Sequence, residues 1–318
     1  MRRIVAIVLL GLLLAAPAMA QGLRGIPEQA ADPLREALRL LETVKSSTLD
    51  PGWRANAAAR AARTLARAGD REAARARAQE AALANAEESR TPPPPGLSEG
   101  AVDALLAQTY ADLQDAPTAH GIAVAAMAAI GRLGDAATRA TLYAYVAQAL
   151  AEIGNADPAA EAVLQGLRSA SVTQPGRERL NALTQLIIAQ AKLGQVEEAR
   201  ATLDAARESL AAVTQPADRP TALAYVARAA AAVGDKTGAQ ALAREAATTY
   251  VRTQAQLTEL QRAVTLALLA LTESEVGDRT AAQQTLRQAR QAADAVQQVY
   301  DRLQAMLSLA DAAVQLER

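Results

Sequence analysis

The chain has 318 residues, a formal net charge of −1 at pH 7, and an apolar share of 51% in which aromatic residues contribute only 2%. Because acidic and basic residues are interspersed and nearly balanced, no basic face is available for a phosphate backbone, which argues against nucleic acid as a partner. The absence of cysteine excludes disulfides, thiolate metal sites and a cysteine nucleophile. The apolar residues are mostly alanine, which favours helices but buries little area, so many closely packed helices and no sheet are expected.

The first twenty residues have the three parts of a secretory signal peptide. Arg2 and Arg3 form the basic start, residues 4–14 are apolar, and Ala18-Met19-Ala20 is a small-x-small cleavage site. We expect cleavage after Ala20 and a location in the periplasm or outside the cell. An uncleaved anchor is the alternative, but the apolar run is short for a membrane span, so no stable span is expected after cleavage.

Residues 21–52 are expected to form an N-terminal segment that contains one capping helix. The predicted helix covers residues 32–47, because Asp32 before Pro33 is a typical helix start. Residues 53–318 then form a repeat array.

Within this array, an apolar helix, a glycine and a second helix recur. We call the recurring glycine position the slot. The slot residues are Gly69, Gln114, Gly154, Gly194, Gly234 and Gly277. An alanine follows each slot by five residues, and apolar residues recur at helical spacing on both sides. Glycine at the slot predicts a left-handed turn that ends the first helix of each pair.

The proline-rich run 91–96 lengthens one repeat and is expected to be a stiff, exposed connector, with a docking peptide as the alternative. Residues 301–317 are expected to form a final single helix. An arginine also recurs fifteen residues before the slot, at Arg54, Arg139, Arg179, Arg219 and Arg262, and Arg302 continues the series. A cation is disfavoured at a helix start, so we expect it to bind carbonyls or an acid at the end of the preceding helix. A ligand contact repeated in every unit is the alternative.

Small residues in the first helix, glycine at its end and an alanine–large–alanine pattern in the second resemble tetratricopeptide (TPR) repeats. Residues 194–206, GQVEEARATLDAA, are the clearest copy, and the resemblance covers about residues 53–310. It implies an all-α, right-handed superhelical solenoid of antiparallel helix pairs, with about six pairs plus terminal capping helices. The units here span 40 or more residues, against about 34 in the family, which indicates a TPR-like member with longer units.

Motifs for a catalytic serine, a zinc protease, a phosphate loop or a calcium loop do not occur in the sequence, and neither a metal nor a cofactor is expected. The single histidine, His120, has no matching serine motif and is expected to be a surface or capping residue. Glu88 and Glu273 stand in Glu-Ser steps that also occur in lytic transglycosylases, but the surrounding catalytic residues are missing. Both are expected on solvated helix faces.

Tyr145 and Tyr225 both stand nine residues before a slot, and Tyr143 lies close by. We expect these rings to fill space between helices, with anchoring of a bound peptide as the alternative.

The resemblance implies that first helices line a concave surface, where TPR-type proteins commonly hold peptides or partner domains. The expected polar positions are Asn56, Arg63, Gln108, Gln148, Glu152, Asn181, Thr184, Lys192, Thr221 and Arg228, with Ala59, Ala104, Ala144 and Ala224 between them. The family's clamp for acidic peptide C-termini is represented only by scattered pieces, so that ligand is not predicted. We therefore expect an exported, non-catalytic scaffold for a protein or peptide partner. The alternatives are an auxiliary subunit of a cell-envelope enzyme or assembly complex and, more weakly, an envelope glycan-cleaving enzyme.

Overall fold

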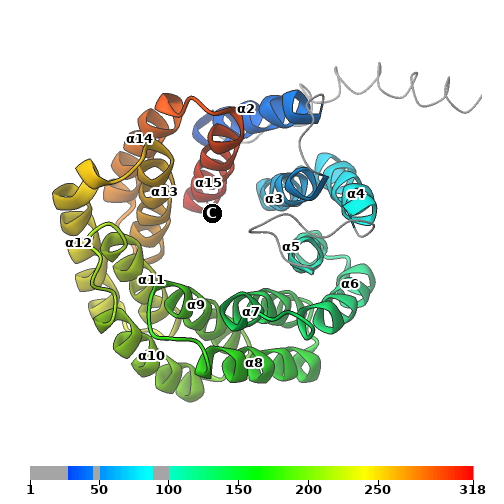
Figure 1. Cartoon of the computed structure of the whole chain (residues 1–318), viewed down its shortest axis with the longest axis horizontal. Coiled ribbons are helices and arrows are strands. Elements are labelled where there is room, and N and C mark those ends of the chain that lie inside the picture. Colours follow the sequence, from blue (N-terminus) through cyan, green and yellow to red (C-terminus); the bar gives the residue numbers. More distant parts are fainter. Residues whose placement is uncertain (1–27, 46–50, 89–99, 318) are drawn as a thin grey trace, which may run out of the picture.

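The computed structural model describes residues 28–45, 51–88 and 100–317, and every regular element within these ranges is a helix (Figure 1). The signal segment, the connector 91–96 and Ser89 lie outside the described residues. No described helix is long and apolar enough to cross a bilayer.

The helices follow one another in packed pairs, which confirms the predicted TPR-like solenoid. The first helices of the pairs are α3 (Pro51–Ala68), α5 (Ala101–Asp112), α7 (Ala136–Glu152), α9 (Arg177–Lys192), α11 (Arg219–Ala232) and α13 (Glu259–Glu275). Their second helices are α4 (Arg71–Glu88), α6 (Ala116–Ile130), α8 (Ala156–Ser171), α10 (Val196–Ala211), α12 (Lys236–Thr253), followed by the short 3₁₀ turn η1 (Gln254–Gln256), and α14 (Arg279–Ala295). First helices form an inner layer and second helices an outer layer (Figure 1).

The predicted left-handed turn is present at the slots. The slot glycines have φ values of 92° (Gly69), 78° (Gly154), 75° (Gly194), 82° (Gly234) and 90° (Gly277). After α7, the Asn155 N–H bonds the Leu150 carbonyl at 2.9 Å and the Gly154 N–H bonds the Ala151 carbonyl at 3.1 Å. These two bonds are the Schellman pattern, in which a left-handed residue lets free helix carbonyls find donors. Gln114, with φ 58°, is the one non-glycine residue with positive φ in the described ranges.

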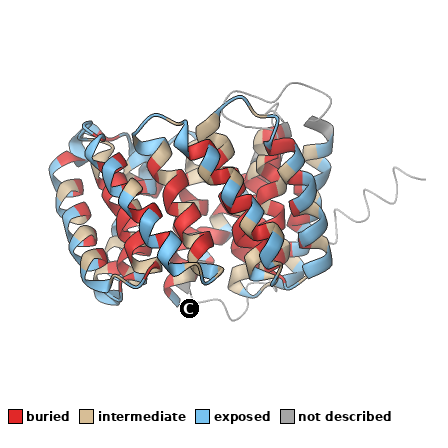
Figure 2. Cartoon of the chain, turned by 90° about the horizontal axis from the view of Figure 1, so that it is seen from below, coloured by how far each residue is buried: buried red, intermediate tan, exposed pale blue. Residues whose placement is uncertain are grey.

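Small residues let the two layers approach closely. The alanine five residues after each slot is fully buried, at Ala74, Ala119, Ala159, Ala199, Ala239 and Ala282. Buried residues gather where helices face one another, and the outer surface of the second helices is exposed (Figure 2). Because an alanine core gains little area per residue, the close approach of many helices supplies the stability.

The solenoid closes into a ring through its terminal helices. The last helix, α15 (Val299–Glu317), packs against α13 and α14 on one side and against α2 (Glu28–Lys45) and α3 on the other (Figure 1). In α15, Arg302, Ala310 and Leu316 continue the first-helix pattern if Glu317 is counted as a slot. The α15 helix therefore acts as the first helix of a further pair.

The second helix of that pair is α2, from the opposite end of the sequence. Its sequence spacing Gly25, Ala30, Leu34 and Ala37 matches the spacing Gly194, Ala199, Leu203 and Ala206. Within α2, Leu34 and Ala37 are fully buried. A repeat stack normally needs polar caps because each end exposes an apolar face. Here the two terminal helices cover each other.

Polar and aromatic contacts cross this junction, which we call the seam and define as the contacts of α15 with α2 and α3. The Trp53 and Tyr300 rings meet edge to face with centroids 4.8 Å apart. Arg60 Nη2 donates to Ser308 Oγ at 2.9 Å. Arg302 lies 3.4 Å from a Glu36 carboxylate oxygen. The seam thus joins residues nearly the whole array apart in sequence.

The start predicted at Asp32 is wrong: α2 begins at Glu28 and holds Pro33 inside. Proline has no backbone N–H, so one hydrogen-bond donor is missing near the start of this helix. The Pro33 side chain is buried. The recurring arginine does bind the end of the preceding helix in α11, where Arg219 Nη1 donates to the Leu210 carbonyl at 2.8 Å. Arg302 instead pairs with an acid there, Asp294, at 3.6 Å.

Candidate binding surface

The positions at thirteen, nine, six and two residues before the slot form one stripe toward the centre of the ring. This stripe is mostly polar in α3 to α11, whereas α13 has Val264, Leu268 and Leu271 at the first three positions. Steps of four, three and four residues keep side chains on one helix face. We call this surface the inner face. It includes Arg60, Arg63, Arg67, Gln108, Asp112, Tyr145, Gln148, Glu152, Gln185, Lys192, Tyr225, Arg228, Glu275, Ser308 and Asp311.

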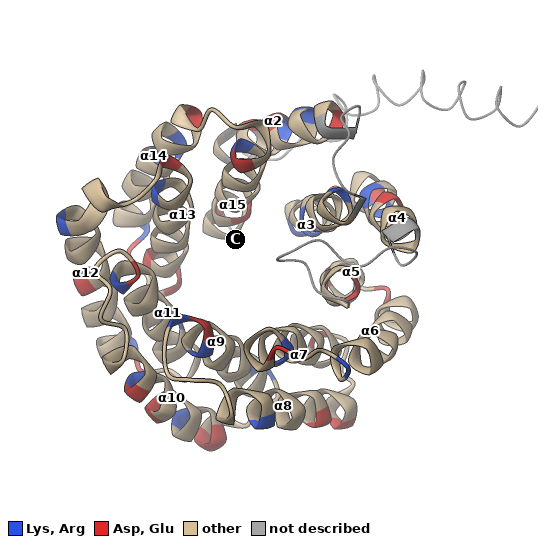
Figure 3. Cartoon of the chain, in the orientation of Figure 1, with Lys and Arg blue, Asp and Glu red and all other residues tan. Residues whose placement is uncertain are grey.

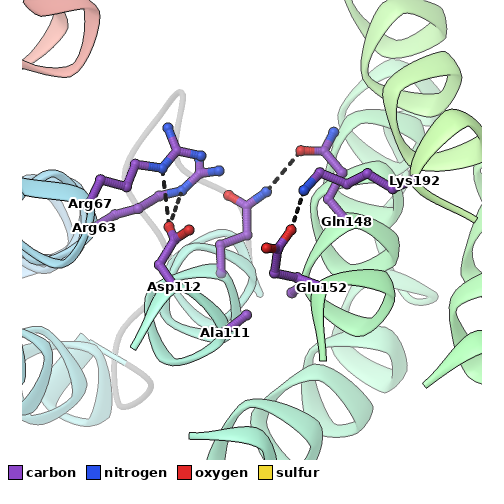
Figure 4. A pocket seen from close by; sticks show the side chains of 9 residues that line it. Arg63, Arg67, Ala111, Asp112, Gln148, Glu152 and Lys192 are labelled. Carbon is purple, nitrogen blue, oxygen red and sulfur yellow. Dashed lines mark hydrogen bonds and ion pairs between the residues drawn. The ribbon is translucent and has the colours of Figure 1, made fainter. Parts of the chain in front are cut away.

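Half of the ten predicted binding residues come together in one small pocket on the inner face (Figure 4). Arg63, Gln108, Gln148, Glu152 and Lys192 line it, and its volume is about 40 Å³. Arg67, Ala111, Asp112 and Ala149 complete the wall and were not among the predicted residues. Arg67 and Asp112 follow the same helical stripe, two residues before their slots, so this spacing was the signal that could have found them.

The other predicted residues lie elsewhere on the first helices. Asn56, Asn181 and Thr221 are partly exposed at the beginning of the stripe, where Thr221 Oγ1 lies 3.3 Å from Thr265 Oγ1. Arg228 lies on the inner face of α11 and is held by both carboxylate oxygens of Glu275, at 2.7 and 2.9 Å.

Thr184 does not lie on the inner face. Its side chain is fully buried, and Oγ1 donates to the Tyr225 carbonyl at 3.2 Å. The four alanines expected beside it on the concave surface are also fully buried, at Ala59, Ala104, Ala144 and Ala224. All five stand ten residues before a slot. This position is one residue away from the inner-face position nine residues before the slot. Because one residue turns a helix by about 100°, its side chains point into the contact between neighbouring first helices.

Ion pairs link successive first helices around the inner face. Arg67 of α3 contacts Asp112 of α5 at 3.1 Å and Asp311 of α15 at 3.0 Å. Lys192 of α9 pairs with Glu152 of α7 (Figure 4). The outer helices carry both signs of charge without one dominating (Figure 3).

Three arginines on α3 make the inner face locally cationic. Burial and repulsion from Arg67 together lower the pKa of Arg63 to about 10, against the attraction of Asp311 and Asp112. Burial likewise lowers the pKa of Arg60. Burial opposes ionisation of Asp311, but Arg67, Arg63 and Arg60 outweigh it and hold the pKa of Asp311 below its usual value. All three arginines remain cations at neutral pH.

Glutamine amides form a ladder across three first helices. Gln108 Nε2 donates to Gln148 Oε1 at 3.3 Å. Gln148 Nε2 donates to the Gln185 carbonyl at 2.9 Å and lies 3.1 Å from Gln185 Oε1. The ladder ends at the pocket.

The tyrosines divide between two roles. Tyr143 is buried, and its hydroxyl reaches the Met127 carbonyl at 3.5 Å, as a space-filling residue does. Tyr145 and Tyr225 are partly exposed on the inner face instead. Burial, with Tyr145 nearby, raises the pKa of Tyr225 to about 12. Tyr145 also interacts electrostatically with Arg60.

His120 and Glu273, two candidate catalytic residues, each contact a polar residue of another helix or helix start. His120 is exposed, and its Nδ1 lies 3.0 Å from Asn155 Nδ2 at the start of α8. Glu273 is only 7% exposed and therefore does not lie on a solvated face as predicted. Burial raises its pKa despite a hydrogen bond with Thr285 of α14. The Glu88 side chain lies outside the described residues. Among the described side chains, no three metal-ligating groups converge.

No protein-family model and no curated protein matches the chain. Two solved structures have a similar helical arrangement. One contains the nearly identical TPR-like repeats of a Podosopora anserina protein assigned to the kinesin light chains, with a TM-score of 0.41 and 19% identity over 65% of this chain and 99% of that one. The other is a Rap protein complexed with competence and sporulation factor, with a TM-score of 0.39 and 13% identity over 84% of this chain and 77% of that one.

Proposed function

We propose that this chain is an exported, non-catalytic scaffold that binds a segment of a protein or peptide partner on the inner face of its ring. The observation that carries the proposal is the composition of that face. Alanine fills most positions between the helices, yet the positions turned to the centre in α3 to α11 carry mostly arginine, glutamine, tyrosine and other polar residues.

The chemistry of the inner face suits a polypeptide. Glutamine amides and tyrosine hydroxyls both donate and accept hydrogen bonds, as peptide groups do. Tyr145 and Tyr225 also add apolar ring surface beside polar atoms, a combination typical of binding surfaces. The pocket of about 40 Å³ is far smaller than the several hundred Å³ of an ordinary small-molecule site. We therefore favour a partner that engages many small subsites along the face.

Export rests on the tripartite N-terminal signal. Fractionation and N-terminal sequencing of the expressed protein test it, with a mature chain that begins at Gln21 as the expected result. A full-length protein that remains in the cytoplasm would contradict export.

Site-specific photo-crosslinking in the producing cell tests the binding surface. A photoreactive phenylalanine analogue at Tyr145 or Tyr225 is expected to capture one discrete polypeptide. The matched control is the same analogue at Leu83, which is 70% exposed on the outer helix α4. Capture from Leu83 alone would refute the inner-face proposal. A stoichiometric envelope enzyme captured from the inner face would favour the auxiliary-subunit alternative.

A further inference from the structure

Two successive outer helices, α6 and α8, expose large aliphatic side chains where the other units have polar ones. The position ten residues after the slot is turned to solvent on all six second helices, and four of them carry Gln79, Asp204, Arg244 and Arg287 there. In α6 and α8 the same position is Val124, 49% exposed, and Leu164, 42% exposed. Because the repeat itself keeps this position polar, two neighbouring exceptions indicate a surface that another molecule covers.

The α6 helix also has no charged residue along its length (Figure 3). The exposed positions of this helix are Ala116, Pro117, His120, Gly121, Val124, Ala125 and Ala128. A helix without a charged face is typical of a helix packed against protein on all sides. The described part of the chain covers only the inward side of α6, so its outward side lacks a partner.

A glycine in the middle of α6 points to the same surface. Glycine weakens a helix interior relative to alanine, so Gly121 needs a physical reason. A Cβ added at Gly166 of α8 would come within 2.5 Å of Leu186 Cδ2, whereas one added at Gly121 would meet no neighbouring element of the described chain within 4 Å. Internal packing therefore explains Gly166 but not Gly121. Close approach of a second helix from outside explains Gly121, because small side chains shorten the distance between packed helices.

The charged residues beside Leu164 make the α8 surface complementary to itself. Asp157 and Glu161 lie in the first half of α8 and Arg168 near its end, at steps of four or three residues that share one helix face. Glu161 accepts a hydrogen bond from Gln165 at 2.6 Å. None of the three charges has an ion-pair partner within the described ranges. Two antiparallel copies of α8 would bring the acidic start of each beside the basic end of the other.

We infer that two copies of this chain associate face to face through α6 and α8, about a two-fold axis that sets each helix antiparallel to its counterpart. Val124 and Leu164 supply the apolar area, and Gly121 lets the two α6 backbones approach. Glu161 pairs with Arg168 of the second copy, which fixes the direction. An isologous two-fold contact of this kind is the commonest one in homo-oligomers.

A second copy fits this surface better than a lipid membrane does. Asp157 and Glu161 would face the headgroups of anionic lipids and be repelled, whereas a second copy offers them Arg168. The surface lies on the outer layer, apart from the inner face and from α2 and α15 (Figure 1). The inference therefore goes beyond the proposed function, and both surfaces can be occupied at once.

Sedimentation equilibrium of the intact mature chain tests the association. We expect a reversible monomer–dimer equilibrium, and a chain that stays monomeric up to about 100 µM would overturn the inference. Val124→Glu should weaken the dimer at least about tenfold, because it buries an unpaired charge. Val251→Glu is the matched control, since Val251 is 65% exposed on the outer helix α12, and it should leave the dimer unchanged. Equal effects of the two substitutions would refute the assigned surface.

Gly121→Gln separates association from folding. Glutamine favours a helix more than glycine does, and the space beside Gly121 is open in the single chain. The variant should therefore unfold no more easily in chemical denaturation, yet it should weaken the dimer because the longer side chain keeps the two α6 helices apart. A dimer of unchanged affinity would contradict the close approach at Gly121.

Exchange of the α8 charges tests the antiparallel arrangement. Glu161→Arg alone and Arg168→Glu alone each place like charges together in both pairs, so each dimer should be weakened at least about tenfold. An equal mixture of the two variants should form a heterodimer of nearly the original affinity, because both pairs are then opposite in charge. A mixture no tighter than its components would refute the arrangement.

Vesicles of anionic phospholipid test the other occupant. The chain should not sediment with them. Sedimentation of the monomer with these vesicles, lost in Val124→Glu and kept in Val251→Glu, would assign the surface to a membrane and overturn the inference.

Discussion

Truncating Leu41 tests whether the terminal helices close the ring. Leu41 lies in α2 and is fully buried, and α2 packs against α15 and α3. Leu41→Ala removes buried methyl groups and leaves a cavity, which costs about 2–5 kcal/mol. This loss is a large fraction of the total free energy of unfolding of a folded protein, which is about 5–15 kcal/mol. Without the docking of α2, Leu41 would be solvated and the same change would cost almost nothing.

Thermal and chemical unfolding followed by circular dichroism measure the effect. We expect the melting temperature to fall by roughly 3–8 °C. Leu83→Ala is the matched control, because Leu83 is 70% exposed on the outer helix α4 and should cost less than about 0.5 kcal/mol. Equal losses from the two substitutions would refute the closed ring.

Three further changes probe single features of the chain. Gln114→Gly relieves a left-handed conformation (φ 58°) and should gain about 0.5–1 kcal/mol in chemical denaturation; a loss would contradict the slot argument. Burial raises the pKa of Glu273, so the folded state binds its proton more tightly and stability falls as pH rises through the folded pKa. Glu273→Gln should therefore stabilise the protein at neutral pH but not in acid, whereas Glu275→Gln, which removes an arginine pair, should destabilise it at neutral pH; similar effects would refute this. Tyr300→Leu removes the ring beside Trp53, the single tryptophan, and should shift its fluorescence emission to the red at a cost of about 1 kcal/mol; an unchanged spectrum would contradict the seam.

The sequence alone determined the repeating unit, because its signals are local. Glycine at positions such as Gly154 and Gly194 indicates a left-handed helix end, since glycine has no Cβ to clash there. Alanines such as Ala199 indicate close helix contacts through their spacing. These features depend on backbone dihedrals and on periodicity within a single unit, so they could be read without knowing where distant residues lie.

The binding surface was only partly predictable. Gln108, Gln148 and Lys192 were found because they are polar and share a helical stripe. Thr184 was misplaced because one residue of phase, about 100° of helix rotation, separates the inner face from a helix contact. Polarity alone could not resolve that difference, because a buried threonine hydroxyl can be satisfied by a backbone carbonyl, as Thr184 is by Tyr225.

Only the tertiary structure decided that the solenoid closes. The patterns of α2 and α15 are visible in the sequence, but each is equally compatible with a separate capping helix. Closure depends on the small rotation between neighbouring units, which accumulates along the array. The accumulated rotation brings Trp53 to Tyr300 and Arg60 to Ser308, and it turns the inner face into the wall of a ring. The sequence does not determine this rotation, because the angle between packed helices is set by how their side chains interlock and not by the spacing of residues along one helix.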